Sequence, residues 1–450
     1  MVEDNDDIVS QVDEITIFPP VNAAADLTDE DSGAENDLTV NNLPASQLQA
    51  PVEIVIESNY DSYFSSDDNI PLSELQSQNT AASNKQKVKT KKRQMHYSWI
   101  KEDLKLPPTD FDSPTNSGIT ENPLELFSKF FDEEVIELIL NQSNKYAQQK
   151  NRKANIAKQE VNAFIGVLIL SGYMQVPRRK MFWEREKDCH NVIITEAITR
   201  DRFEYLFSNL HVCDNQQLDQ GDKFAKLRPL STLLNKKFMD NSSLEEMHSV
   251  DEAMVPYYGC HSCKQYIRGK PVRYGYKLWV GSTRLGYWNW FEPYQGASTN
   301  ISENFSELGV GAGVVLEYAQ ALRKEWPDKK CHLFFDNFFT SIPLIEKLTD
   351  WNFYATGTVG ENRLKDISLI DSKLIKKQRR GSYDYAKIVE QNIIAVKWHD
   401  NSVVSVCSNF SGVAPIHSVT RYSQKEKKNI QVQQPHLIQM YNTNMECRPL

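Results

Sequence analysis

Apolar residues recur at intervals of three and four positions between residues 122 and 239, a pattern typical of helices with one buried side. Capping residues and first-turn prolines mark the helix starts, at Asn122 with Pro123, Asp132, Thr199 and Pro229. The apolar sides of the three clearest helices contain Val135, Ile136, Ile139 and Leu140, then Val161, Phe164, Ile165, Leu168 and Ile169, and then Phe203, Leu206, Phe207 and Leu210. We therefore expect an α-helical domain over residues 122–245.

After His248 the pattern changes to strands joined by helices. Strands are predicted over residues 248–255, 272–280 and 286–294, and their short connections favour an antiparallel meander. Next come a helix over 314–325, a buried strand over 331–335, a helix capped by Thr340 or Ser341, and a strand over 353–359. Because a strand-helix-strand crossover requires parallel neighbours, this order predicts an α/β fold in which a mixed sheet has helices on its faces.

Charge is unevenly distributed along the 450-residue chain, which contains 51 Lys+Arg and 60 Asp+Glu. Residues 1–84 hold 18 Asp+Glu and no Lys or Arg, so residues 85–450 hold 51 basic against 42 acidic residues, a net charge of +9. The first segment is also poor in aromatic residues and is predicted to be a disordered acidic tail. The remaining chain is mildly basic, so the overall negative charge does not exclude nucleic acid as a partner.

A dense basic run begins the next segment, a basic linker over residues 85–121, with Lys85, Lys87, Lys89, Lys91, Lys92 and Arg93. An exposed run of this kind favours recognition by a nuclear import receptor; the alternatives are a phosphate-contacting arm and a solvated linker. The N-terminus has no secretory signal, and the longest apolar stretch, residues 163–174, is too short to cross a bilayer. We therefore predict a nuclear protein without membrane association.

The seven cysteines are odd in number and scattered along the chain, which favours reduced thiols in a cytosolic or nuclear compartment. Cys260, His261 and Cys263 resemble half of a zinc site, but no second Cys or His pair follows at a useful spacing. No zinc is expected, and this segment is predicted to be a turn.

Two aspartates stand out by their positions on predicted strands. Asp251 lies inside the first strand, and Asp336 ends the buried strand over 331–335, so pairing of these strands would bring the carboxylates together. Two converging carboxylates form a hard-oxygen site suited to Mg²⁺, and a pair of such ions promotes phosphodiester displacement. The alternative is that Asp336 caps a helix and Asp251 is an exposed strand residue.

Basic residues gather in the turn and strand that follow Asp251, at Lys264, Arg268, Lys270, Arg273 and Lys277. Such a patch is a candidate contact surface for DNA phosphates, and the alternative is an ordinary solvated face.

Several blocks resemble piggyBac-type transposases in the order in which that family has them. The first catalytic block is similar to residues 251–259 (DEAMVPYYG), 264–271 (KQYIRGKP) and 275–279 (GYKLW), and the second is similar to residues 335–341 (FDNFFTS) and 355–359 (ATGTV). The similarity spans residues 124–441. It resembles in particular the host-domesticated, piggyBac transposable element-derived proteins, which often carry acidic N-terminal tails.

The resemblance implies an RNase H-like core over residues 246–360 that uses three acidic residues and Mg²⁺ to cut and rejoin DNA at TTAA sites. Asp251 and Asp336 match the first two acids. It also implies a β-rich insertion over 361–418 and a truncated return to the core over 419–450. The segment that carries the third acid in the family is replaced by residues 444–450 (NMECRPL), where Glu446 is the one nearby acid, so we expect that acid and its helix to be missing.

These observations predict a transposase-derived nuclear DNA-binding protein whose DDE core is incomplete and catalytically inactive. One alternative is an active Mg²⁺-dependent cut-and-paste transposase, and another is an interaction module that acts through the acidic tail. The implied partners are DNA, a second copy of the chain and a nuclear import receptor.

Overall fold

The computed structural model describes residues 97–105, 111, 122–186, 189–267, 270–364, 367–424 and 426–445, and before them the strands β1 (Val12–Ile17) and β2 (Val52–Ile56). The chain divides into two compact units. One contains Met1–Ala82 and Val255–Tyr276, and the other contains Ser83–Met254 and Lys277–Leu450. Both predicted aspartates belong to the second unit.

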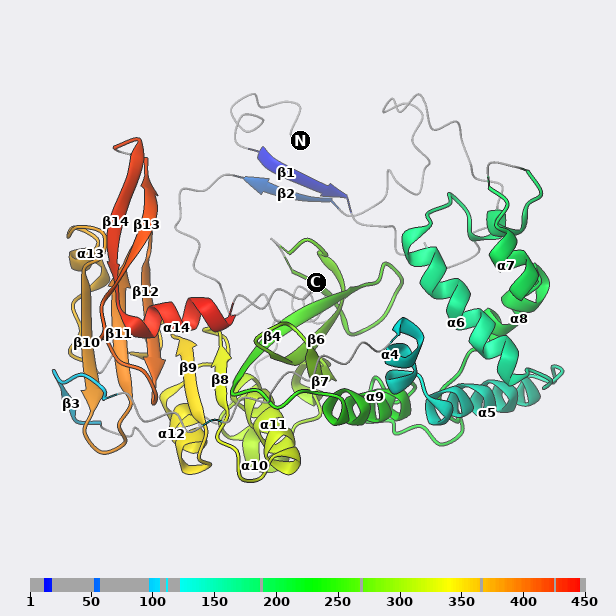
Figure 1. Ribbon diagram of the computed structural model, residues 1–450, viewed down its shortest axis with the longest axis horizontal. Helices are drawn as coiled ribbons and strands as arrows, with labels where there is room; N and C mark the ends of the chain where they lie inside the picture. The colour runs from blue at the N-terminus through cyan, green and yellow to red at the C-terminus, as the bar shows by residue number, and fades with distance from the viewer. Residues whose placement is uncertain are drawn as a thin grey trace, which may run out of the picture. The chain divides into compact units, whose positions relative to one another are not determined.

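The second unit begins with the predicted helices (Figure 1). They are α4 (Pro123–Phe130), α5 (Glu133–Gln149), α6 (Lys158–Tyr173), α7 (Val192–Ala197), α8 (Arg200–Asn209) and α9 (Arg228–Asp240). The side chains of Asn122, Asp132 and Thr199 accept hydrogen bonds from backbone N–H groups in the first turns of α4, α5 and α8, which confirms these predicted caps. Much of the predicted apolar sides meets in one core that includes Val135 and Phe203. Four residues predicted on these sides are instead exposed, namely Leu168, Ile169, Phe207 and Leu210.

A mixed sheet follows, again as the pattern predicts. Its central strands and the helices between them are β4 (Met247–Pro256), β6 (Tyr274–Thr283), β7 (Trp288–Pro293), α10 (Glu303–Ser306), α11 (Val310–Glu325), β8 (His332–Phe335), α12 (Ile342–Asp350) and β9 (Tyr354–Thr358). The strand order is β7-β6-β4-β8-β9, with β4, β8 and β9 parallel, which is the predicted RNase H-like arrangement. α11 and α12 pack on one face, where Leu333 and Phe335 are fully buried.

The β-rich region extends the same sheet. Its elements are α13 (Ser372–Ile375), β10 (Tyr383–Ile388), β11 (Ile394–His399) and β12 (Val403–Ser408). A further short strand, β3 (Trp99–Ile100), comes from the segment predicted to be a linker. β12 pairs antiparallel with β9, and β11, β10 and β3 follow in order toward the edge. The insertion therefore adds strands to the central mixed sheet through main-chain hydrogen bonds.

The chain then forms an antiparallel ribbon of β13 (His417–Ser423) and β14 (Lys428–Gln434), followed by α14 (His436–Met445). α14 contacts β8, β9 and β12 and is the red helix in Figure 1. Leu437 and Ile438 are buried in it against the strands of the β-rich region. This helix was not predicted, and it forms because its two apolar side chains cover a face of the sheet. Residues 446–450, where the third acid and its helix are expected to be missing, lie outside the described residues.

The first unit contains two antiparallel pairs of strands. β1 pairs with β2, which differs from the disorder expected at these positions, and both strands contain β-branched residues that favour extended structure. The rest of the acidic tail lies outside the described residues. The predicted turn at Cys260–Cys263 is present, and it leads into β5 (Lys264–Tyr266), which pairs with the start of β6 and was not predicted.

Candidate functional site

Parallel pairing of β4 and β8 brings Asp251 and Asp336 together. The register aligns Ser249 with Phe334 and Val250 with Phe335, so the next residue in each of the two segments is an aspartate. Neighbouring strands lie about 4.8 Å apart, and aligned residues of parallel strands project from the same face. The predicted convergence of the two carboxylates therefore follows from the backbone register.

The environment of Asp336 disfavours its negative charge. Burial, and secondarily the nearby Glu252 carboxylate, raise the pKa of Asp336 to about 6. The backbone N–H of Phe338 donates to the carboxylate at 2.9 Å, and this bond and the Lys277 ammonium oppose the shift. A bound cation would therefore stabilise the ionised form of this carboxylate.

A clamp of hydrogen bonds shapes the loop that follows Asp336. The Thr340 hydroxyl donates to the Asp336 carbonyl oxygen at 2.7 Å. The Arg363 guanidinium donates to the carbonyl oxygens of Asn337, at 2.9 Å, and of Phe338 and Thr340. Sequence reasoning missed Arg363, because its partners are main-chain atoms more than 20 residues earlier and leave no local pattern.

Lys277 differs from the other described members of the predicted basic patch because it is buried. Its side chain is on β6 and the residue is only 3% exposed. The ammonium lies 4.0 Å from the ring centroid of Trp279, 5.2 Å from that of Phe338 and 5.5 Å from that of Tyr294. This placement corrects the expectation of a surface phosphate contact at Lys277, because the aromatic rings of β6 and the Asp336 loop enclose the charge.

The remaining predicted basic residues belong to the first unit. Arg273 is exposed, and Lys264 and Lys270 are partly exposed, on the segment that forms β5 and the start of β6. Arg268 lies outside the described residues, as do Glu446 and all the basic residues of the run at 85–93.

α14 brings Tyr441 toward the aspartate pair. Burial raises the pKa of the Tyr441 phenol, the charges of Asp336 and Asp251 add to this rise, and a hydrogen bond with Thr358 opposes it. The phenol oxygen is 3.4 Å from the Thr358 hydroxyl. The electrostatic effect of both carboxylates on one phenol indicates that all three groups share a region of the sheet surface.

The donor set of this site fits one divalent ion such as Mg²⁺. The two carboxylates, one inside β4 and one directly after β8, match the one or two that Mg²⁺ takes from a protein, and the burial of Asp336 favours a bound cation. Within the described residues no cluster of three or more His, Cys, Asp or Glu side chains is arranged around a metal position. Asp251 and Asp336 would hold the ion. When bound, such an ion would stabilise negative charge on phosphoryl oxygens and lower the pKa of a bound water.

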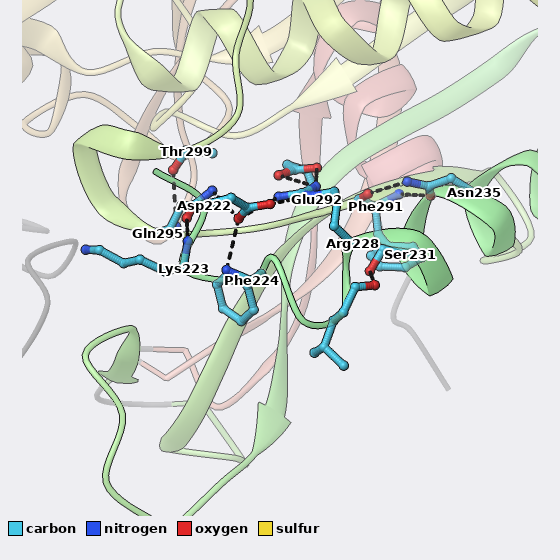
Figure 2. A network of polar contacts seen from close by, with 11 residues as sticks. Asp222, Lys223, Phe224, Arg228, Ser231, Asn235, Phe291, Glu292, Gln295 and Thr299 are labelled. Carbon is cyan, nitrogen blue, oxygen red and sulfur yellow. Dashed lines mark hydrogen bonds and ion pairs between the residues drawn. The ribbon is translucent and has the colours of Figure 1, made fainter. Parts of the chain in front are cut away.

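A buried polar network joins the helices to the sheet (Figure 2). Arg228, at the start of α9, donates to Asp222 at 2.7 Å and to both carboxylate oxygens of Glu292, at 3.0 and 2.8 Å. Burial raises the pKa of Glu292 to about 7 despite Arg228. Gln295 donates to Asp222 at 3.2 Å and accepts from the Lys223 N–H at 2.8 Å. These bonds fix α9 against the end of β7.

Comparison with known proteins identifies the family. The family model described as Transposase IS4 matches residues 122–448. The human piggyBac transposable element-derived protein 3 is 44% identical over 456 residues, covering 99% of this chain and 76% of the relative. The chain belongs to the piggyBac transposable element-derived family. The human piggyBac transposable element-derived protein 2 is 42% identical over 435 residues, covering 95% of this chain and 70% of the relative.

The fold agrees with this assignment to the piggyBac family. A cryo-EM structure of a piggyBac transposase synaptic complex with hairpin DNA superposes with a TM-score of 0.56 at 22% identity, covering 74% of this chain and 68% of that one. This likeness shows a shared fold, and the predicted mixed sheet with flanking helices is confirmed. Among the described helices, none has the length and apolar character required to cross a membrane.

Proposed function

We propose that this transposase-derived protein binds DNA in the nucleus and that its aspartate pair holds Mg²⁺ without carrying out strand transfer. The catalytic part is supported by the donor set, because Asp251 and Asp336 converge without a third His, Cys, Asp or Glu around a metal position in the described residues. Tyr441 of α14 lies in the same region. A protonated phenol adds no negative charge to a metal site, and catalytic metal geometry tolerates little looseness.

DNA binding is supported by charge and by fold. Residues 85–450 have a net charge of +9, from 51 basic and 42 acidic residues. Lys264, Lys270 and Arg273 lie together on the short segment around β5, where they are exposed or partly exposed. The transposase with the shared fold is bound to hairpin DNA. We infer that this segment contacts the phosphate backbone.

Nuclear import is inferred from the run at residues 85–93. Replacing Lys85, Lys87, Lys89, Lys91, Lys92 and Arg93 by Gln is expected to leave a fluorescently tagged full chain in the cytoplasm. An unchanged nuclear signal would assign import to another part of the chain.

The DNA interaction is tested by the salt dependence of binding. We expect the affinity of the full chain for duplex DNA to fall steeply with salt, because phosphate contacts release counterions. The variant Lys264→Ala/Lys270→Ala/Arg273→Ala is expected to lower the slope of log K against log salt by about 2 to 3. The matched control is Lys373→Ala/Lys376→Ala/Lys377→Ala, which removes equal charge from exposed positions on and beside α13. Equal losses in both variants would contradict a specific role for the β5 segment.

The catalytic part is tested by nicking of DNA that contains TTAA, with Mg²⁺ or Mn²⁺ and with Asp251→Ala as control. We expect no nicking by the folded protein while DNA is still retained. Cleavage that disappears in Asp251→Ala would show a complete site and establish the active transposase instead. A further variant, Tyr441→Glu, supplies a carboxylate from α14, and its melting temperature is expected to rise with Mn²⁺ more than that of Tyr441→Gln.

A further inference from the structure

A large groove lies in the second unit, away from the aspartate pair. It is formed by α5, the segment 212–222, α9, Trp290 of β7 and the last turn of α11, and we call it the α5–α9 groove. Its volume is about 1280 Å³, above the range of about 300–1,000 Å³ typical of small-molecule pockets. The groove is therefore large enough for a polypeptide segment.

The α5–α9 groove carries more negative than positive side chains. Seven carboxylates and three cationic side chains line it. Asp222 is paired with Arg228, Asp214 with Lys145, and Glu134 with Lys237. Four further carboxylates are exposed along the groove and belong to no ion pair that we find among the described residues, namely Glu137, Asp219, Asp240 and Glu325.

The floor between these carboxylates is apolar and contains an unused acceptor. Leu138, Leu233 and Trp290 are partly exposed there, and Met239 is 8% exposed. Gln142 also lines the groove, and its amide oxygen has no hydrogen-bond partner within the described part of the chain. This oxygen is itself buried, so an incoming N–H group gains it as an acceptor once the Gln142 side chain turns toward the groove. The groove thus offers apolar contacts, negative charge and an acceptor together.

We propose that the α5–α9 groove binds a lysine- and arginine-rich peptide segment of a partner protein, with an apolar side chain on the floor. The carboxylate excess excludes a phosphate backbone from this surface, because like charges repel at short range. Of the three cationic side chains, Arg228 is neutralised by Asp222 and Glu292 (Figure 2). The four carboxylates for which we find no ion pair among the described residues outnumber the other two, Lys236 and Lys324. The α5–α9 groove and the segment around β5 would therefore bind different ligands.

The test uses the full chain and a short fluorescent peptide of lysine, arginine and leucine, followed by fluorescence anisotropy. We expect binding that weakens with salt and is lost when glutamate replaces the basic residues of the peptide. Omitting the leucine is expected to weaken binding about threefold or more through loss of the floor contact. A glutamate peptide that binds equally well would overturn the proposal.

Charge reversal on the protein localises the interaction. Glu137→Lys/Asp240→Lys is expected to weaken peptide binding about tenfold at low salt, and Glu325→Lys alone about threefold. The matched control, Glu303→Lys/Glu307→Lys, changes two exposed carboxylates on and beside α10 that do not line the groove. Equal effects of the two double variants would overturn the proposal, as would undiminished binding by Glu325→Lys. A higher peptide affinity after Gln replacement of the basic residues at 85–93 would assign the groove to this chain's own basic run instead.

Discussion

Asp251 and Asp336 occupy aligned positions on neighbouring parallel chain segments, one residue beyond the paired Val250 and Phe335. Burial and the nearby Glu252 carboxylate disfavour the ionisation of Asp336, and a nearby cation offsets both effects. The Lys277 ammonium, which lies over the Trp279 ring, has this effect on Asp336 and lowers its pKa. The piggyBac fold thus holds a negatively charged pair beside an enclosed ammonium group.

Lys277→Met is expected to raise the pKa of Asp336 further. The pKa of Asp336 is about 6 when folded against a normal value of 3.8, so the folded state binds the proton more tightly and the unfolding free energy decreases as pH rises between these values. Without the ammonium this decrease should continue above pH 6. Urea unfolding at several pH values measures it, with Lys347→Met, a lysine that is exposed beside the Trp351 ring, as control. An unchanged profile would show that Lys277 does not act on Asp336.

Glu292→Gln is expected to remove a second pH-dependent contribution to the free energy of unfolding. The carboxyl is 7% exposed, and burial raises its pKa from 4.5 to about 7. The folded state therefore binds this proton more tightly, and unfolding free energy is lost as pH rises from about 4.5 to 7. Relative to the native chain, the Gln variant should gain about 1–3 kcal/mol between pH 4.5 and pH 8. Chemical unfolding at both pH values checks the sign, and a relative loss would contradict it.

Asn235→Asp is expected to weaken the attachment of α9 to β7. The Asn235 amide donates to the Phe291 carbonyl and accepts from the Phe291 N–H, each at 2.8 Å. A carboxylate retains the acceptor but places a second oxygen against the carbonyl, at a cost of about 2–3 kcal/mol. Asn304→Asp on the exposed side of α10 is the matched control and should change the unfolding free energy by less than about 0.5 kcal/mol.

Gly281→Ala is expected to destabilise the core of the sheet. A Cβ at this position would lie 2.4–2.6 Å from ring atoms of Tyr318, which is fully buried and hydrogen-bonded to His248 and Asn289. The expected cost is about 1–3 kcal/mol. Gly166→Ala, in α6 with open space around its Cβ position, should instead be neutral or stabilise by up to about 1 kcal/mol. Thermal melts of both variants compare them, and equal effects would contradict the role of Tyr318.

The sequence by itself determined the helices, the central sheet and the position of the aspartate pair. The caps at Asn122, Asp132 and Thr199 and the apolar repeats are local signals, so they predict helices without knowledge of what the helices contact. The parallel strands follow from the crossover helices between them. Alignment of Asp251 with Asp336 then depends only on strand register.

Only the tertiary structure decided what surrounds these carboxylates. Lys264 and Lys277 both lie in basic, aromatic stretches of sequence, yet only Lys277 is enclosed by rings, one of them Phe338 from the loop beyond β8. The charges of both aspartates act on Tyr441 because α14 packs on β8 and β9, which precede it by about 80 residues or more in the sequence. The α5–α9 groove likewise combines residues from five separated segments. Periodicity and capping are short-range properties of a chain, whereas burial, charge pairing and grooves depend on which distant segments pack together.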